Sequence, residues 1–428
     1  MSLDSIVTHV AAAMGAVIAL SYVVGQLFRR MGQPEVIGQL FVGIALGPSL
    51  LGRLPGNVMR TLFPTAVVPY LNVTSQVAII LFLFAVGYEL DARVLRRQRK
   101  TVPLLSVSTF AVPMLLGVTS VYAGADWYRS AGESGTGTAP FILFMGVAIS
   151  ITAVPVLASI VTERGIAATV PGVTALTSAA LIDAVGWLVL AGVLVLASAS
   201  SSAHRPWIVT ALLLAGYVAV MVFAVRPVMK WWLGRPSAVL ANKVPVAVAV
   251  TLGSAWATAA LGLHVIFGAF FAGLIMPRDE NGVPYTDLLQ PVLDAGRLLI
   301  PVFFVISGLS ANIGALRAGD FGLLGLLTVI AFAGKAGTGY VAARAGGMGR
   351  YDAKVTGVLL NTRGLTELIA LNVGLQAGII HQRLYTILVL MALVTTAATG
   401  PLLSLLTTQE PVQGAERSLV PDGAVGDG

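Results

Sequence analysis

The sequence predicts an all-α polytopic membrane protein with about 13 transmembrane helices, and composition is the first reason. Of its 428 residues, 57% are hydrophobic and only 11% are charged, whereas a soluble domain carries about 25% charged residues. The mean hydropathy is +0.88, and the 47 glycines are typical of helices that span membranes. The composition excludes a soluble globular protein, and its high apolar content excludes a disordered chain.

Thirteen apolar runs are the second reason, because a membrane helix needs about 20 mostly apolar residues. The first run is too long for the apolar part of a signal peptide and has no small-residue cleavage site, so we expect it to be retained. The short run 264–277 follows 244–262 almost without a loop. In order, the runs lie near residues 6–28, 34–51, 72–90, 101–122, 139–162, 171–198, 206–225, 244–262, 264–277, 289–309, 321–343, 355–377 and 384–406.

The basic residues predict the orientation of these spans. With thirteen spans and an outer N-terminus, 18 of the 26 Lys and Arg residues fall in inner loops and six in outer loops. Cytoplasmic loops carry such an excess, so we expect a multi-pass plasma-membrane protein with its C-terminus in the cytoplasm. The pI near 9.8 then reflects topology, and no nucleic-acid partner is expected. The basic cluster at 93–100 should lie against anionic headgroups of the bilayer.

The predicted organisation is a transmembrane domain over 6–407 followed by a disordered cytoplasmic tail over 408–428. The loop 123–138 is rich in Gly, Ser and Thr, which predicts a flexible connector. Cysteine is absent, which excludes disulfides, thiolate catalysis and Cys-ligated metals. The sequence contains no nucleotide fingerprint, zinc spacing or P-loop, and no cofactor is expected.

Ionisable residues inside a bilayer are costly and are candidates for function. Four lie well inside the predicted spans: Asp183, Lys335, Arg363 and Glu367. Three further acidic residues lie at span ends, where we expect interfacial positions: Glu35, Glu89 and Asp91.

Asp183 lies about twelve residues into its span, near the bilayer midplane, with no basic residue within a turn or two. Desolvation disfavours a lone charged carboxylate, so this group should be either protonated or ionised with a bound cation. A site shared by a proton and a cation needs both states. The alternative is a protonated Asp that is hydrogen-bonded to a neighbouring helix.

The preceding span contains Thr152 and Pro155. Pro155 lacks an N–H and clashes with the carbonyl of Ile151, which predicts a helix break there. The freed Ile151 carbonyl and the Thr152 hydroxyl would be oxygen ligands at membrane depth, where irregular backbone is tolerated only inside protein or beside a cavity. Monovalent metal cations such as Na⁺ need such oxygen ligands, so Thr152 and Asp183 are the predicted metal-ligating side chains.

The other deep charges have both functional and structural interpretations. Lys335 lies between glycines that allow close helix approach, and it is either a partner for an acidic site or a cation that pins helices together. Arg363 and Glu367 are spaced i,i+4 and can pair, which favours a structural role in fixing crossing helices. Thr362 and Gly364 predict a second helix break. Two interrupted spans, one in each half of the chain, indicate a transporter built from inverted repeats.

Seven segments, in order along the chain, resemble the monovalent cation/proton antiporter superfamily, in the branch of bacterial sodium/proton and potassium-efflux exchangers. They cover residues 35–52, 81–91, 152–157, 180–187, 264–277, 301–308 and 361–368. The resemblance implies a core domain with two crossing broken helices and a scaffold domain that mediates homodimerisation. It places the ion-binding aspartate at Asp183 and the core lysine at Lys335. It also implies elevator-like alternating access, in which proton and cation compete for one carboxylate.

One residue departs from the family pattern. The family usually has Asp or Asn immediately before the essential aspartate, and this chain has Ile182. A paired aspartate would allow two protons per cycle, whereas one titratable carboxylate favours one proton per cation and electroneutral exchange. The change also removes an oxygen ligand, which bears on the choice of ion.

The leading hypothesis is therefore a cation/proton antiporter that exchanges Na⁺ or K⁺ for H⁺ at Asp183. Thr152, the Ile151 carbonyl and Ser178 would supply further oxygens, although Ser178 is five residues from Asp183 and need not share its face. The alternatives are a symporter or exporter of another solute on the same scaffold, or an ion channel. An enzyme is not expected, because the membrane-embedded residues include no Ser/His/Asp or metal-ligand set.

Overall fold

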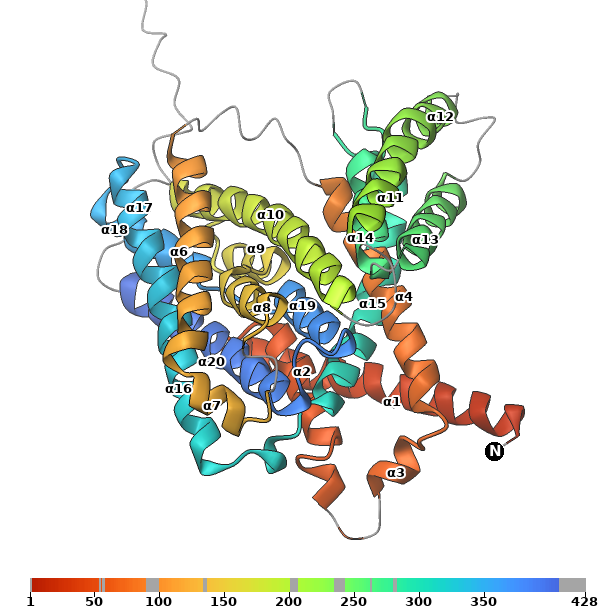
Figure 1. The fold of residues 1–428 in the computed structure, drawn as a ribbon, viewed down its shortest axis with the longest axis horizontal. Coiled ribbons are helices and arrows are strands. Elements are labelled where there is room, and N and C mark those ends of the chain that lie inside the picture. The colour runs from red at the N-terminus through yellow and green to blue at the C-terminus, as the bar shows by residue number, and fades with distance from the viewer. Residues whose placement is uncertain are drawn as a thin grey trace, which may run out of the picture.

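The computed structural model describes residues 2–53, 55, 58–89, 100–133, 137–200, 207–234, 243–261, 264–279 and 283–407, and within them every regular element is a helix. The predicted helical membrane fold is confirmed (Figure 1). The basic residues at 93–99 and the tail at 408–428 lie outside the described residues, so the predictions made for them stay predictions.

Each predicted apolar run contains one to three consecutive helical elements. The first half of the chain forms α1 (Leu3–Arg30), α2 (Glu35–Leu46), α4 (Val68–Glu89), α6 (Thr101–Ala123), α8 (Ala139–Ser150), α9 (Val154–Glu163) and α10 (Val170–Ser200). The next helices are α11 (Trp207–Val220), η2 (Met221–Val225), α12 (Arg226–Leu233), α13 (Val244–Ala260), α14 (Val265–Ile275) and α15 (Thr286–Ser310). The last are α16 (Ala318–Phe332), η4 (Ala333–Gly337), α17 (Thr338–Ala345), α18 (Arg350–Leu360), α19 (Leu365–Gln376) and α20 (Gln382–Thr407).

Ten helical segments of the described chain are long and apolar enough to cross a membrane, whereas α13 and α14 are shorter. The run at 355–377 is divided between α18, with 11 residues, and α19, with 12. The count of thirteen spans therefore stays a prediction. Short helices connect the spans: η1 (Leu51–Arg53), α3 (Val58–Leu62), α7 (Ala125–Ser130) and η3 (Ile313–Ala315).

The helices pack in two groups, which Figure 1 shows side by side. We call α6 to α10 together with α16 to α20 the core group, and α1 to α4 together with α11 to α15 the scaffold group. The strongest helix contacts fall within one group, such as α6 with α8 or α4 with α15. The core group holds both broken spans, each the middle of three consecutive spans.

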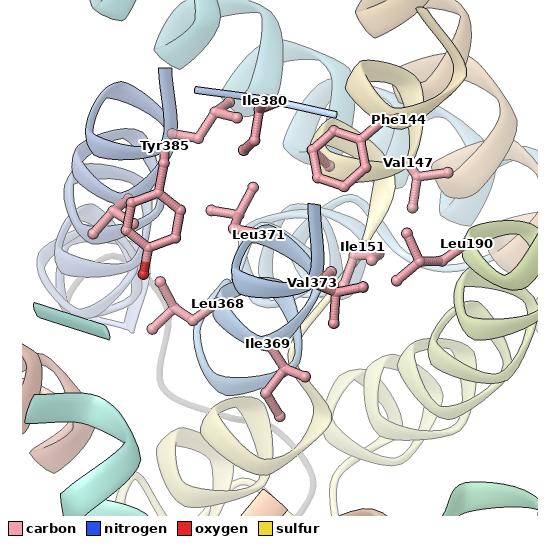
Figure 2. Close-up of a cluster of buried hydrophobic side chains, with 14 of the residues drawn as sticks. Phe144, Val147, Ile151, Leu190, Leu368, Ile369, Leu371, Val373, Ile380 and Tyr385 are labelled. Atoms are coloured by element: carbon pink, nitrogen blue, oxygen red, sulfur yellow. The ribbon is translucent and has the colours of Figure 1, made fainter. Parts of the chain in front are cut away.

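A buried apolar cluster joins the two groups. It combines Leu40 of α2 and Phe303 of α15 with Phe144 of α8 and Leu368 of α19. Figure 2 shows its core-group members around α19, including Tyr385 of α20. Burial of apolar side chains does not by itself drive helix association in lipid, so close packing must hold these helices together.

Glycines allow α4 and α14 to approach at the level of their backbones. A Cβ atom on Gly87 of α4 would overlap the carbonyl oxygen of Phe270, and one on Gly273 of α14 would overlap that of Phe84. Such small residues at an interface are how membrane helices gain close packing. The short α14 is thereby fixed within the scaffold group.

The prediction of a flexible connector at 123–138 is wrong for its first part. Residues 125–130 form α7, and the side chain of Glu133 is buried, with 1% exposure. Glu133 accepts hydrogen bonds from the backbone N–H of His381 at 2.8 Å and pairs with its ring Nδ1 at 3.0 Å. This tertiary contact, which composition does not reveal, orders the segment.

Candidate ion-binding site

The two broken spans cross at their breaks, as the resemblance implies. The helix stops at Ser150 and resumes at Val154, and the second span stops at Leu360 and resumes at Leu365. Pro155 occupies the first turn of α9, where its missing N–H costs no helical bond. Gly364 has φ +153°, a conformation that only glycine adopts readily. The backbone N–H of Ala153 donates to the Thr362 carbonyl at 3.2 Å, which joins the two breaks.

Cationic side chains satisfy the free end of α8. The last carbonyls of a helix lack helical donors and carry partial negative charge. Arg363 donates from Nη1 to the Ala148 carbonyl at 3.0 Å and from Nη2 to the Ile149 carbonyl at 2.6 Å. These bonds explain why an arginine is stable at this depth.

Lys335 binds the same helix end from a different element. Its Nζ donates to the Ser150 carbonyl and, at 2.6 Å, to the Thr152 hydroxyl oxygen. The residue lies in η4, a π-helical segment of the α16–α17 span, and it is fully buried. π-Bulges are frequent at functional sites. Lys335 therefore contacts the protein interior and does not extend toward a membrane surface.

The predicted Arg363–Glu367 pair is present. Arg363 Nη1 lies 2.8 Å from Glu367 Oε1, and both side chains have 0% exposure. Glu367 lies in the first turn of α19, where the partial positive charge of the helix N-terminus favours a carboxylate. The positive Arg363 thus lies at the partly negative end of α8, and the negative Glu367 lies at the partly positive start of α19.

Asp183 of α10 is 1% exposed, and neither carboxylate oxygen has a hydrogen-bond partner of normal geometry among the described residues. The Thr366 hydroxyl is near enough to act on it as a hydrogen-bond donor, and the Lys335 ammonium group acts on it through its charge. Buried polar atoms are almost always satisfied in proteins, and this carboxylate has unused hydrogen-bonding capacity that a further ligand could fill.

A funnel of about 1080 Å³ leads to this carboxylate. Its inner end is lined by Asp183 together with Val154 and Leu365, the first residues of α9 and α19. Charged residues line its mouth, and they are Arg29, Glu35, Glu89, Glu163 and Arg297. We call the membrane side of this mouth the funnel side and the opposite side, which the funnel does not reach, the sealed side.

The structure places the other predicted ligands differently. The Thr152 hydroxyl accepts the Lys335 bond and donates to the Leu360 carbonyl at 3.4 Å. Ile151 is buried at the end of α8, and Ser178 is buried where its carbonyl faces the Ser106 hydroxyl of α6. Asp183 and Pro155 line the funnel, whereas Thr152, Ile151 and Ser178 do not. Their assignment as ion ligands stays a prediction.

The sequence analysis did not single out Thr366, and it did not place Glu35 and Glu89 at the mouth of a funnel. Thr366 is fully buried, and its hydroxyl lies 3.5 Å from the Thr152 carbonyl. A hydroxyl residue just after the second break, matching Thr152 at the first, is the signal that could have revealed it. Glu35 and Glu89, expected only at an interface, line the mouth of the funnel. Asp91 lies outside the described residues.

Ile182 belongs to an apolar cluster and does not face the funnel. It is 1% exposed and packs with Ala153 and Val156 of the first broken span. Apolar packing therefore occupies the position where the family usually has a second polar residue.

The chain matches the family described as sodium/hydrogen exchanger, transmembrane, over residues 15–409. It is 37% identical over 391 residues to the Na(+)/H(+) antiporter NhaS4 of Synechocystis, with 90% of this chain and 94% of that protein covered. It is also 36% identical to cation/H(+) antiporter 20 of Arabidopsis thaliana and 32% identical to K(+)/H(+) antiporter 1 of Saccharomyces cerevisiae. These matches cover 94% and 92% of this chain, which spans about half the length of those two relatives.

A solved structure has the same fold. The sodium proton antiporter MjNhaP1 of Methanocaldococcus jannaschii superimposes with a TM-score of 0.70 at 14% sequence identity, covering 94% of this chain and 99% of that one. The crossing broken spans, the family match over nearly all the helices and this shared fold agree with one another, and the chain belongs to the sodium/hydrogen exchanger family.

Proposed function

We propose that this protein is a secondary active transporter that exchanges a monovalent cation, Na⁺ or K⁺, for H⁺ by alternating access. The observation that carries the proposal is the Asp183 carboxylate, which is buried at the end of a funnel with the Thr366 hydroxyl as its one hydrogen-bonding neighbour among the described residues. The relatives are named as Na⁺/H⁺, K⁺/H⁺ and cation/H⁺ antiporters. Family membership supports a transporter and not an enzyme.

The buried charges support exchange at a single site. Lys335 and Arg363 carry two positive charges, and Glu367 with ionised Asp183 carries two negative charges, so the four sum to zero. Protonation of Asp183 and binding of one monovalent cation to it each raise this sum by one. Both loaded forms of the core group then carry the same charge, so a one-for-one exchange at this site would be electroneutral. Apolar packing around Ile182 leaves no second carboxylate there.

The half-helices α9 and α19 should help Asp183 to alternate between a bound proton and a bound cation. The N-termini of α9 and α19 reach the inner end of the funnel through Val154 and Leu365, and their partial positive charge favours ionised Asp183. Burial opposes the ionised form. These opposed effects support a carboxylate that is stable with either a proton or a cation, while the Thr366 hydroxyl can take part in either state.

The orientation and assembly are also proposed. The funnel side carries the excess of basic loops, so the funnel opens to the cytoplasm if the protein lies in the plasma membrane. The scaffold group would form the interface of a homodimer. The core group would then carry Asp183 past this scaffold to the opposite side.

Reconstitution in vesicles tests the proposal directly. A pH gradient is imposed, Na⁺, K⁺ or Li⁺ is added, and a pH-sensitive dye reports the gradient. We expect cation-dependent dissipation by the native protein and a rate equal to that of empty vesicles for Asp183→Asn, because the amide can neither release a proton nor neutralise a cation. Asp126→Asn is the matched control, since Asp126 lies on the short helix α7 with its side chain 95% exposed.

The two parts of the proposal fail in different ways. A native protein that responds to none of the three cations rules out monovalent cation/proton exchange. A native protein that responds, with an Asp183→Asn variant that responds equally, rules out Asp183 as the shared site.

A further inference from the structure

The end of α15 and the beginning of α20 are joined by hydrogen bonds on the sealed side. The Tyr385 hydroxyl donates to the Ser307 carbonyl at 3.1 Å, and Gln382 Nε2 donates to the Ser310 carbonyl at 3.0 Å. The donors belong to the core group and the acceptors to the scaffold group. These bonds therefore connect the two groups that alternating access must separate.

The acceptors are carbonyls that α15 cannot satisfy itself. The last four carbonyls of a helix lack helical donors. The N–H that would reach Ser307, that of Ala311, bonds to the Gly308 carbonyl instead, and Ser310 is the last residue of α15. The core group thus supplies hydrogen-bond donors that the end of a scaffold helix needs.

The acceptors lie on a rigid part of the scaffold. Gly43 of α2 and Gly308 of α15 touch at backbone level, because a Cβ on Gly308 would lie 2.6 Å from the Gly43 Cα. The carbonyls of the α15 end are held against α2 and cannot follow the core group when it moves. A third hydrogen bond between the two segments, from the Asn312 N–H to the Thr386 hydroxyl oxygen at 3.1 Å, lies beside them.

These bonds also lie between Asp183 and the sealed surface. The last α15 residue that lines the funnel is Phe304, and Ser307 follows one turn later. Tyr385 has 0% exposure and is surrounded by the apolar cluster (Figure 2).

We propose that Tyr385 and Gln382 form a latch that holds the sealed side closed while the funnel is open and that releases in each transport cycle. The proposal rests on the alternating access proposed above. When the latch opens, water enters and hydrates the α15 carbonyls, so opening exchanges protein bonds for water bonds at a small net cost. The two states can then interconvert, and loss of a latch donor favours the sealed-side-open state.

The natural absence of cysteine allows a single-cysteine test that does not depend on transport. Ile44→Cys places a thiol in the apolar cluster near the sealed-side end of α2, and Leu293→Cys places one in the funnel. Each single-cysteine protein is labelled with a membrane-impermeant maleimide, once with no further change (the parent) and once with Tyr385→Phe added. The labelling rate of Ile44→Cys reports how often the sealed side opens.

We expect Tyr385→Phe to raise the labelling rate of Ile44→Cys about fivefold, the factor that corresponds to one buried hydrogen bond of about 1 kcal/mol. Leu293→Cys should label at an equal or lower rate, because the funnel closes whenever the sealed side opens. Gln382→Met removes the second donor at similar side-chain length, and it should also raise the labelling rate of Ile44→Cys.

Tyr128→Phe is the matched control. Tyr128 is equally buried, and its hydroxyl pairs with the Ser120 hydroxyl at 2.9 Å within the core group. This variant loses the same kind of bond without touching the scaffold, so Ile44→Cys should label as in the parent. The latch is overturned if Ile44→Cys labels at the same rate in Tyr385→Phe as in the parent. It is also overturned if Tyr128→Phe raises that labelling rate as much as Tyr385→Phe does. A protein that fails in the pH-gradient assay still gives these rates, so the two proposals fail separately.

Discussion

The buried charges of the core group differ in the partners that they contact. Arg363 and Lys335 bind the three last carbonyls of α8, and Glu367 lies at the start of α19. Glu367 pairs with Arg363, whereas Asp183 has no ion pair within 4 Å and no backbone hydrogen bond among the described residues. Residues of similar charge therefore have different surroundings, and the hydrogen bonds distinguish the paired charges from the proposed carrier.

Arg363→Met should be strongly destabilising because it leaves Glu367 charged, buried and without a counter-ion. Breaking a buried pair in this way costs about 3–5 kcal/mol, and the Ala148 and Ile149 carbonyls also lose their donors. Thermal unfolding in detergent should show a large decrease in Tm. Arg129→Met, which breaks the exposed Arg129–Asp126 pair, should change the stability by less than about 1 kcal/mol. Equal Tm values for both variants would contradict a structural role for Arg363.

Individual helices of the scaffold group depend on backbone contact more than on side-chain bulk. The α4–α14 contact passes through Gly87 and Gly273, each of which lies against a carbonyl of the other helix. The short α14 reaches its place at the funnel wall through Leu274, next to Gly273. The position of Leu274 in the funnel wall therefore depends on the absence of a side chain at Gly273.

Gly273→Ala should separate α4 from α14, because its methyl group would meet the Phe84 carbonyl oxygen. Overpacking of this kind costs about 1–3 kcal/mol, which a lower Tm in detergent should show. Gly253→Ala in α13 is the control: nothing lies within 4 Å of its Cβ position, and removal of a helical glycine should leave stability equal or raise it. A Tm for Gly273→Ala equal to that of Gly253→Ala would be inconsistent with the packing described.

The whole molecule is asymmetric across the membrane. A funnel reaches Asp183 from one side, while an apolar cluster and the α15–α20 hydrogen bonds close the other. In this arrangement the Asp183 carboxylate can be reached from the funnel side. The proposed competition between proton and cation for that carboxylate would depend on this whole arrangement and not on a single residue.

Cation binding should consequently depend on pH with a slope that counts protons. If one proton competes at Asp183, the apparent Kd for Na⁺ or K⁺ rises about tenfold for each unit that the pH falls on the acidic side and becomes constant on the alkaline side. Isothermal titration of the purified protein across a pH series measures this. A hundredfold change per unit would indicate two competing protons, and a flat profile would show that the proton and the cation do not share a site.

The sequence alone determined the membrane fold, because the apolar runs must satisfy their backbone bonds as helices in a bilayer. It also determined both helix breaks, since Pro155 and Gly364 have local backbone requirements that no partner is needed to reveal. The i,i+4 spacing of Arg363 and Glu367 is local in the same way, and their pairing could be predicted.

Only the tertiary structure decided which groups meet across helices. Lys335 lies 183 residues from Thr152 in sequence yet bonds its hydroxyl, and Tyr385 lies 78 residues from Ser307. Glu133, in a segment with the composition of a flexible loop, is ordered by His381. The reason is physical: helix propensity, proline geometry and i,i+4 pairing act within one or two turns, whereas the partner of a side chain on another helix depends on how the whole bundle packs.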